Sequence, residues 1–146
     1  MGFFPDTMPG VEPDFVDRQF WDHCNQHELR FQACGACGVP RHPPVPVCPK
    51  CLSTDQKWTK APPQAAVYSF TVIHHASHEA VKEMLPYVVA TVAFESLPGL
   101  RLVSNIVTPD VRQVYIGMPV QLQWDATAQG QQIPRFIPIA SQKEKA

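Results

Sequence analysis

Residues 34–51, CGACGVPRHPPVPVCPKC, contain two Cys-x-x-Cys pairs, Cys34/Cys37 and Cys48/Cys51, separated by ten residues. Each pair can fold into a tight knuckle that directs two sulfur atoms at one point. Two such knuckles supply four thiolates, which form the closed tetrahedral shell that structural zinc prefers. The stretch therefore predicts a small zinc-bound ribbon in the first half of the chain.

Other chemistries of four cysteines fit this chain less well. Disulfide frameworks belong to secreted chains, and residues 1–16 lack the basic and apolar segments of a secretory signal, so a cytoplasmic location is expected. A thioredoxin-type redox site would use a single Cys-x-x-Cys in a βαβ setting. A catalytic zinc would keep one coordination position open, whereas four thiolates leave none. Iron in a rubredoxin-like site uses the same spacing and stays open as an alternative.

The composition describes a globular chain without a strong overall charge. Hydrophobic residues make up 45% and charged residues 17% of the sequence, and the apolar run at 88–94 is too short to span a bilayer. The net charge of −1 argues against duplex DNA or an anionic membrane as a partner. Residues 28–60 carry five basic and two acidic side chains, and this basic surplus offsets the charge of a four-thiolate zinc site.

The first part of the chain is predicted to be an extended arm followed by one helix. Residues 1–13 are rich in Gly and Pro and have no periodic pattern. Four apolar residues then recur at helical spacing, namely Val16, Phe20, Trp21 and Cys24. Asp14 can cap this helix, which is expected to end near His27 because residues 29–31 resemble a strand that enters the cysteine segment.

The rest of the chain is predicted to be almost entirely β. Sixteen prolines disfavour long helices, and β-branched and aromatic residues alternate in short runs. The expected strands are 67–74, 87–95, 100–107, 114–116, 120–124 and 136–137, with helical turns at 78–85. Short antiparallel strands must close or cover their edges, and a small barrel of the OB-fold type does this with about 80 residues. The predicted fold is therefore mainly β, with an N-terminal arm and helix (1–33), a rubredoxin-like zinc ribbon (34–60) and a five- to six-stranded OB-fold domain (61–146).

The sequence offers no catalytic constellation. Cys24 lies on the apolar face of the predicted helix and is expected to be a small buried residue. His74, His75 and His78 are close in sequence, but neighbours on a strand face opposite sides, which disfavours a shared metal ion. No Ser-His-Asp order, phosphate loop or dinucleotide turn is present.

The order of these parts resembles the zinc-ribbon plus OB-fold proteins of the DUF35 family. The segments that carry the resemblance are Phe20-Trp21, Leu29, Cys34-x2-Cys37-Gly38, Pro43-Pro44, Cys48-Pro49-x-Cys51, 67–72, 86–90, 116–120 and 134–136. Two positions depart from the family pattern. His27 stands where the family usually ends its first helix with glycine, and 61–65 replaces a Ser-Gly-x-Gly turn.

The resemblance implies a function that the residues alone do not. Family members act as non-catalytic accessory subunits of thiolase-fold acyl-CoA enzymes, including thiolases, acyltransferases and steroid side-chain aldolases; others accompany MaoC-type enoyl-CoA hydratases. We therefore expect a hetero-oligomer in which the arm, the helix and the loop at 40–46 contact the partner. The candidate interface residues are Phe20, Trp21, Pro43 and Pro44, and Arg41, Lys50 and Lys60 are candidates for contacts with coenzyme A phosphates.

Two further function classes stay open. A stand-alone acyl-CoA-binding protein would need no partner. A single-stranded nucleic-acid binder would use an aromatic, basic face of the barrel, but residues 67–139 carry only four cations against five acidic residues, so no nucleic-acid partner is expected.

Overall fold

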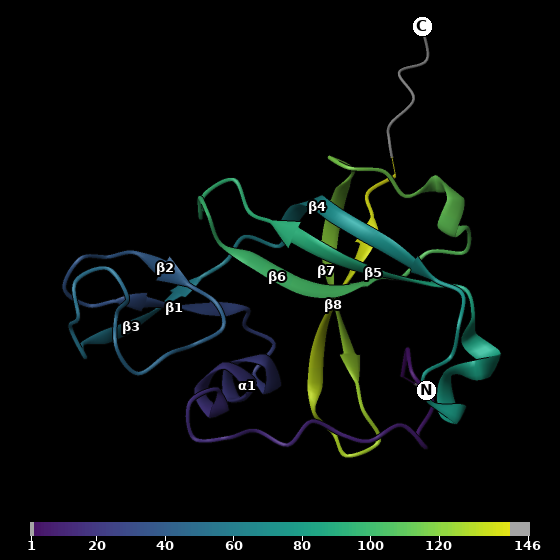
Figure 1. Cartoon of the computed structure of the whole chain (residues 1–146), viewed down its shortest axis with the longest axis horizontal. Coiled ribbons are helices and arrows are strands. Elements are labelled where there is room, and N and C mark those ends of the chain that lie inside the picture. Colours follow the sequence, from purple (N-terminus) through teal and green to yellow (C-terminus); the bar gives the residue numbers. More distant parts are fainter. Residues whose placement is uncertain (1, 141–146) are drawn as a thin grey trace, which may run out of the picture.

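The computed structural model describes residues 2–140 as a small ribbon joined to a β-barrel, with one helix between them (Figure 1). Strands β1 (Arg30–Cys34), β2 (Pro40–Arg41) and β3 (Gln56–Lys60) form the ribbon sheet in the order β2-β1-β3. The two cysteine knuckles lie in the connections that follow β1 and precede β3. The sheet itself thus runs from residue 30 to residue 60, and the boundaries proposed at 33/34 and 60/61 stay predictions.

The barrel contains five strands, as the OB-fold prediction requires. They are β4 (Gln64–Ile73), β5 (Tyr87–Ala93), β6 (Arg101–Ile106), β7 (Pro119–Ala126) and β8 (Gln132–Pro138). The strands close in the order β4-β5-β6-β8-β7, and all pairs are antiparallel except the β6–β8 pair. Alternation of buried and half-buried residues along β5 places its even-numbered side chains inside the barrel.

Two short 3-10 helices join the strands. The helical turns predicted at 78–85 form η1 (Glu79–Met84), whose first turn is capped by the His78 ring. The strand predicted at 114–116 is wrong, because these residues follow η2 (Val111–Gln113) in a turn that the Tyr115 carbonyl closes on the Met118 amide. Only Val114 of the three is buried, so this apolar run does not form a paired strand.

The helix α1 (Arg18–Asn25) is shorter than predicted and begins one turn later. The Asp14 carboxylate accepts hydrogen bonds from the amides of Val16 and Asp17, so Asp14 stabilises the turn before the helix. After the helix His27 adopts a φ of 57°, a left-handed conformation that costs little only for glycine. His27 thus occupies a left-handed position of the kind that favours glycine.

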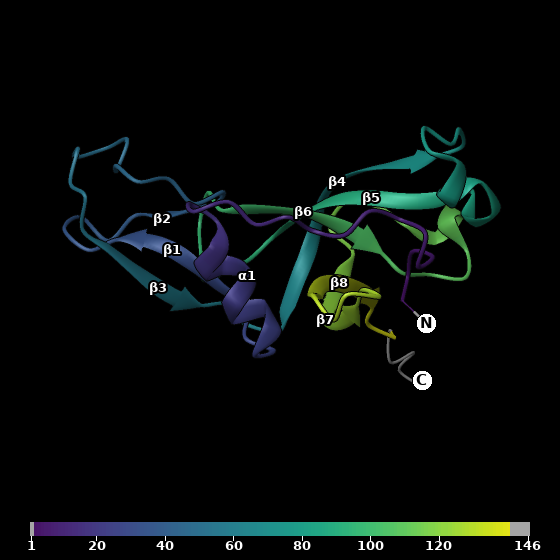
Figure 2. The ribbon, with the colours of Figure 1, turned by 90° about the horizontal axis from the view of Figure 1, so that it is seen from below.

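One continuous core joins the ribbon to the barrel. Phe20 and Cys24 of α1 pack with Phe31 of β1, and the Phe31 ring lies 5.4 Å from the ring of Phe94, next to the barrel. Phe94 in turn lies 6.3 Å from Phe136 of β8. The ribbon, helix and barrel consequently form a single packed unit, which Figure 2 shows as two lobes that meet at α1.

The N-terminal arm packs along the barrel rather than extending away from it (Figure 2). The Phe3 amide donates a hydrogen bond of 2.8 Å to Asp125 of β7, and the rings of Phe3 and Phe4 lie 5.3 and 5.0 Å from the guanidinium of Arg135. Phe4 also contacts Tyr87 edge to face. These two rings therefore pack on the chain's own barrel, and the expectation that the arm contacts a partner stays a prediction.

No helix in the described part of the chain combines the length and the apolar character needed to cross a bilayer.

Candidate functional site

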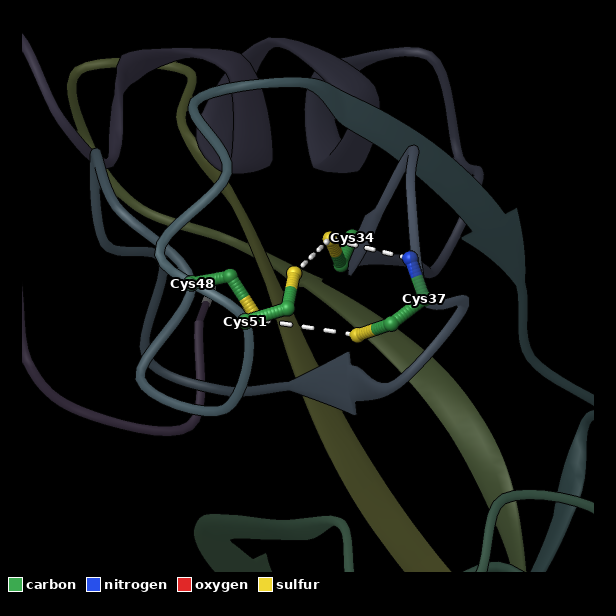
Figure 3. Close-up of side chains that lie close together, drawn as sticks. All are labelled: Cys34, Cys37, Cys48 and Cys51. Atoms are coloured by element: carbon green, nitrogen blue, oxygen red, sulfur yellow. Dashed lines mark hydrogen bonds between the residues drawn. The ribbon is translucent and has the colours of Figure 1, made fainter.

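The four cysteines of the ribbon converge on one point (Figure 3). Their Sγ atoms all lie within 4.8 Å of one another, with Cys34 3.5 Å from Cys51 and Cys37 3.7 Å from Cys48. Four sulfurs around zinc at the usual Zn–S distance of about 2.3 Å would be about 3.8 Å apart. The observed set is thus close to the size of a tetrahedral four-thiolate site.

Backbone amides support the thiolate form of two of these cysteines. The Cys37 N–H donates to the Cys34 Sγ at 3.4 Å, and this bond, together with the Ala36 amide and the neighbouring cysteine thiols, lowers the pKa of the Cys34 thiol to about 6. Amides of Cys51 and Lys50 lower the pKa of Cys48 in the same way.

The two knuckles have the same backbone geometry but different sequences. The amide of Gly38 donates to the Cys34 carbonyl at 2.9 Å, and the amide of Leu52 donates to the Cys48 carbonyl at 2.9 Å. Gly38 has a φ of 76° and Leu52 a φ of 63°. The sequence identified Gly38, but nothing in it marked Leu52 as the residue in the equivalent left-handed position.

The remaining reactive side chains do not form a second site. Cys24 is fully buried, and burial raises the pKa of its thiol to about 12, which confirms the predicted structural role. The three histidines at 74–78 are exposed; His78 caps η1 through its Nδ1. Among residues 2–140 the ribbon cysteines form the only group of three or more ligands close enough to hold one metal ion.

The predicted phosphate-binding residues are not brought together. Arg41 is 9% exposed, and its guanidinium donates to Gln32 and to the Val45 carbonyl. Lys60 of β3 stands opposite Arg30 of β1 in the strand register, at the end of the ribbon sheet that lies away from the cysteines. Lys50 lies within the second knuckle. Contacts with coenzyme A phosphates thus stay a prediction for Lys50 and Lys60, whose side chains are exposed.

The four predicted interface residues line one groove between the ribbon and the barrel. Phe20 forms its floor and is 3% exposed, while Trp21 and Pro43 are accessible. The groove is lined on the ribbon side by Phe20, Trp21, His42, Pro43 and Pro44 and on the barrel side by residues 102–104 and 133–135. Sequence reasoning found the ribbon side of the groove but gave no sign of its barrel side.

Comparison with known proteins identifies the family. Residues 21–55 match the family model of the ChsH2 rubredoxin-like zinc ribbon domain, and residues 58–125 match that of the ChsH2 C-terminal OB-fold domain. The chain is 36% identical to a chain of the solved Ltp2-ChsH2(DUF35) aldolase, with a TM-score of 0.78, and covers 98% of that chain and 90% of its own length. The chain belongs to the ChsH2/DUF35 family.

Two curated relatives extend the comparison. A DUF35 domain-containing scaffold protein of Methanocaldococcus jannaschii is 35% identical over 103 residues, which cover 69% of this chain and 71% of the relative. A probable enoyl-CoA hydratase alpha subunit of Thermomonospora curvata is 41% identical over 129 residues. These residues cover 88% of this chain but 39% of that relative, so the chain spans about two fifths of its length.

Proposed function

We propose that this DUF35 chain is a non-catalytic accessory subunit of a thiolase-fold acyl-CoA enzyme, either a thiolase, an acyltransferase or a side-chain retro-aldolase. In this role it stabilises the complex and helps to shape the binding site for the CoA ester. The observation that carries the proposal is the match, at 36% identity, to 98% of a chain of the Ltp2-ChsH2(DUF35) aldolase.

The chemistry of the described residues supports a scaffold rather than an enzyme. Four thiolates close the coordination shell of a metal ion and leave no position for substrate. Cys24 is buried with a raised pKa, so it is not a nucleophile. Catalytic groups would then come from the partner.

We also propose that the metal ion is zinc and that its task is structural. The sulfur spacing fits tetrahedral coordination, and metal binding to such a ribbon is coupled to its folding. Iron would occupy the same four thiolates, and metal analysis of the purified protein distinguishes the two ions.

A second partner class is a MaoC-type enoyl-CoA hydratase. The specific observation in its favour is the 41% identity to the probable enoyl-CoA hydratase alpha subunit.

The alternative of a nucleic-acid binder loses support because the arm contacts the face that such a ligand would use. In an OB-fold this face includes the second and third strands and the loop between the last two strands. The arm contacts this region at Tyr87, and Gly10 of the arm lies against the side chain of Gln129.

The test is co-expression of a tagged copy with its untagged genomic neighbours, followed by size-exclusion chromatography and assay of the partner. We expect a stable hetero-oligomer whose partner turns over a CoA ester faster with this chain than without it. The ester that reacts distinguishes retro-aldol cleavage and thiolysis from hydration. A stable monomer beside a neighbour that is fully active alone would refute the proposal.

A further inference from the structure

Strand β6 has one open edge inside the groove. It pairs with β5 along its whole length, from Val88↔Ile106 to Ala93↔Arg101. On its other side it meets β8 at a single position, Ile106↔Phe136. The barrel therefore closes at one end of β6, and within residues 2–140 no strand pairs with the stretch from Arg101 to Ser104 on that side.

The backbone geometry shows which groups the open edge presents. The Val107 amide donates to the Phe136 carbonyl at 2.8 Å, so odd-numbered residues of this segment direct their N–H and C=O groups toward β8. Val103, four residues earlier, directs its backbone groups to the same side. The β8 residue that would continue the ladder is Pro134, which has no N–H, and its carbonyl is taken by the Ser104 hydroxyl.

The groove over this edge is suited to an extended peptide. Its ribbon wall offers the apolar surfaces of Trp21 and Pro43, with the buried Pro44 behind them, and Val103 is 67% exposed. Asp17 is the one carboxylate among the lining residues; it accepts hydrogen bonds from the Asp14 amide and the Trp21 indole but has no cationic partner among residues 2–140. The guanidinium of Arg135, by contrast, is already paired with Asp125 at 3.2 Å. An occupant would therefore need a free main chain, alternating apolar side chains and a cationic residue near Asp17.

We propose that an extended segment of the partner enzyme, about four residues long and bearing a Lys or Arg, adds to the open edge of β6 as a further strand. The mode is strand addition, in which main-chain hydrogen bonds give affinity and side-chain pockets give specificity. The open stretch spans roughly 10 Å at the usual rise of about 3.3 Å per residue, which sets this length. The proposal rests on the proposed function, since the partner supplies the segment.

Two substitutions at one position separate the main chain from the side chain. Val103→Pro removes the outward N–H but leaves the pairing with β5 intact, because proline is tolerated where a strand N–H faces away from the sheet. Val103→Thr keeps the N–H and the β-branched shape and is the matched control. With the co-expressed partner we expect Val103→Pro to weaken binding roughly tenfold and Val103→Thr to change it less than about twofold.

Hydrogen–deuterium exchange of the unmodified protein tests the same bond without a mutation. In the free chain the Val103 amide should exchange quickly while the Leu102 and Ser104 amides are protected by β5. In the complex the Val103 amide should become protected as well.

The possible failures are distinguishable. If the wild-type chain binds no neighbour, the proposed function itself fails. Strand addition is refuted, while the accessory role stands, if a complex forms and the two variants bind the partner with the same affinity as each other. The same conclusion follows if the Val103 amide stays unprotected in the complex. Protection of Val103 in a homodimer, or by coenzyme A alone, would likewise refute a partner-derived strand.

Discussion

His42 should make the stability of this protein depend on pH. Its ring contacts two phenylalanines, with centroids 4.8 Å from Phe20 and 5.2 Å from Phe31, and its Nδ1 is buried with no hydrogen-bond partner in the part of the chain that the structure describes. Burial lowers the pKa of His42 from 6.5 to about 4, against an opposing effect of the Asp17 carboxylate. The folded protein therefore holds this imidazole in its neutral form.

The sign and size of the effect follow from proton linkage. Because the pKa is lower in the folded state, the unfolded chain binds more protons between pH 6.5 and pH 4, and the free energy of unfolding falls as the pH falls through this window. Between pH 7.5 and pH 5 the expected loss attributable to His42 is about 2 kcal/mol. His42→Phe keeps an aromatic ring in the cluster and removes the titrating group.

Urea denaturation of both proteins at a series of pH values measures this difference. We expect the wild-type protein to lose about 2 kcal/mol more than His42→Phe between pH 7.5 and pH 5. Acid release of the metal and protonation of His23, whose pKa is also lowered by burial, are common to both proteins and cancel. Parallel pH profiles for the two proteins would show that His42 is not buried in its neutral form, and His42→Leu serves as a second variant without an imidazole.

Three further predictions concern the ribbon and the arm. Cys48→Ser should abolish stoichiometric metal binding and make residues 30–60 sensitive to protease. Metal analysis and limited proteolysis measure these two effects. Retention of one metal ion per chain would contradict the four-thiolate site. Leu52→Gly should raise the free energy of unfolding by up to about 1 kcal/mol, whereas Gly38→Leu should lower it by about 1–2 kcal/mol, because both positions have a left-handed backbone conformation. Urea titrations measure both changes. Two changes of the same sign would refute the reasoning. Asp125→Ala should lower the free energy of unfolding by roughly 3 kcal/mol in the same assay, because the largely buried Arg135 keeps its bond to Asn105 but loses its carboxylate partner. A loss under about 1 kcal/mol would indicate that solvent reaches the guanidinium.

The sequence predicted those parts of the fold that depend on local chemistry. The cysteine spacing is sufficient for the metal site, because each knuckle is determined by four consecutive residues. The five barrel strands follow from β-branched alternation. The error at 114–116 has the same origin, since an apolar run predicts burial, and here only Val114 is buried while Tyr115 and Ile116 are exposed.

Features that depend on distant contacts were not predictable. Helical periodicity placed Phe20 and Trp21 on one apolar face. It did not show that the Phe20 ring enters the core while the Trp21 ring stays at the groove. Arg41 was taken as a free cation because nothing in its neighbourhood reveals that Gln32 would bind its guanidinium. The open edge of β6 arises from Pro134, thirty residues away in sequence, and is visible only once the strand order is known.

The hydrogen bond between Phe3 and Asp125 also implies a sequence of folding steps during synthesis of the chain, because the arm must wait for β7. It joins residues 122 positions apart, whereas the widest pair in the ribbon ladder, Arg30 with Lys60, is separated by 30. The ribbon can thus take up its metal ion while later residues are still on the ribosome, but the barrel closes only after β8 has emerged. The arm can therefore reach its final position only after β7 has been synthesised.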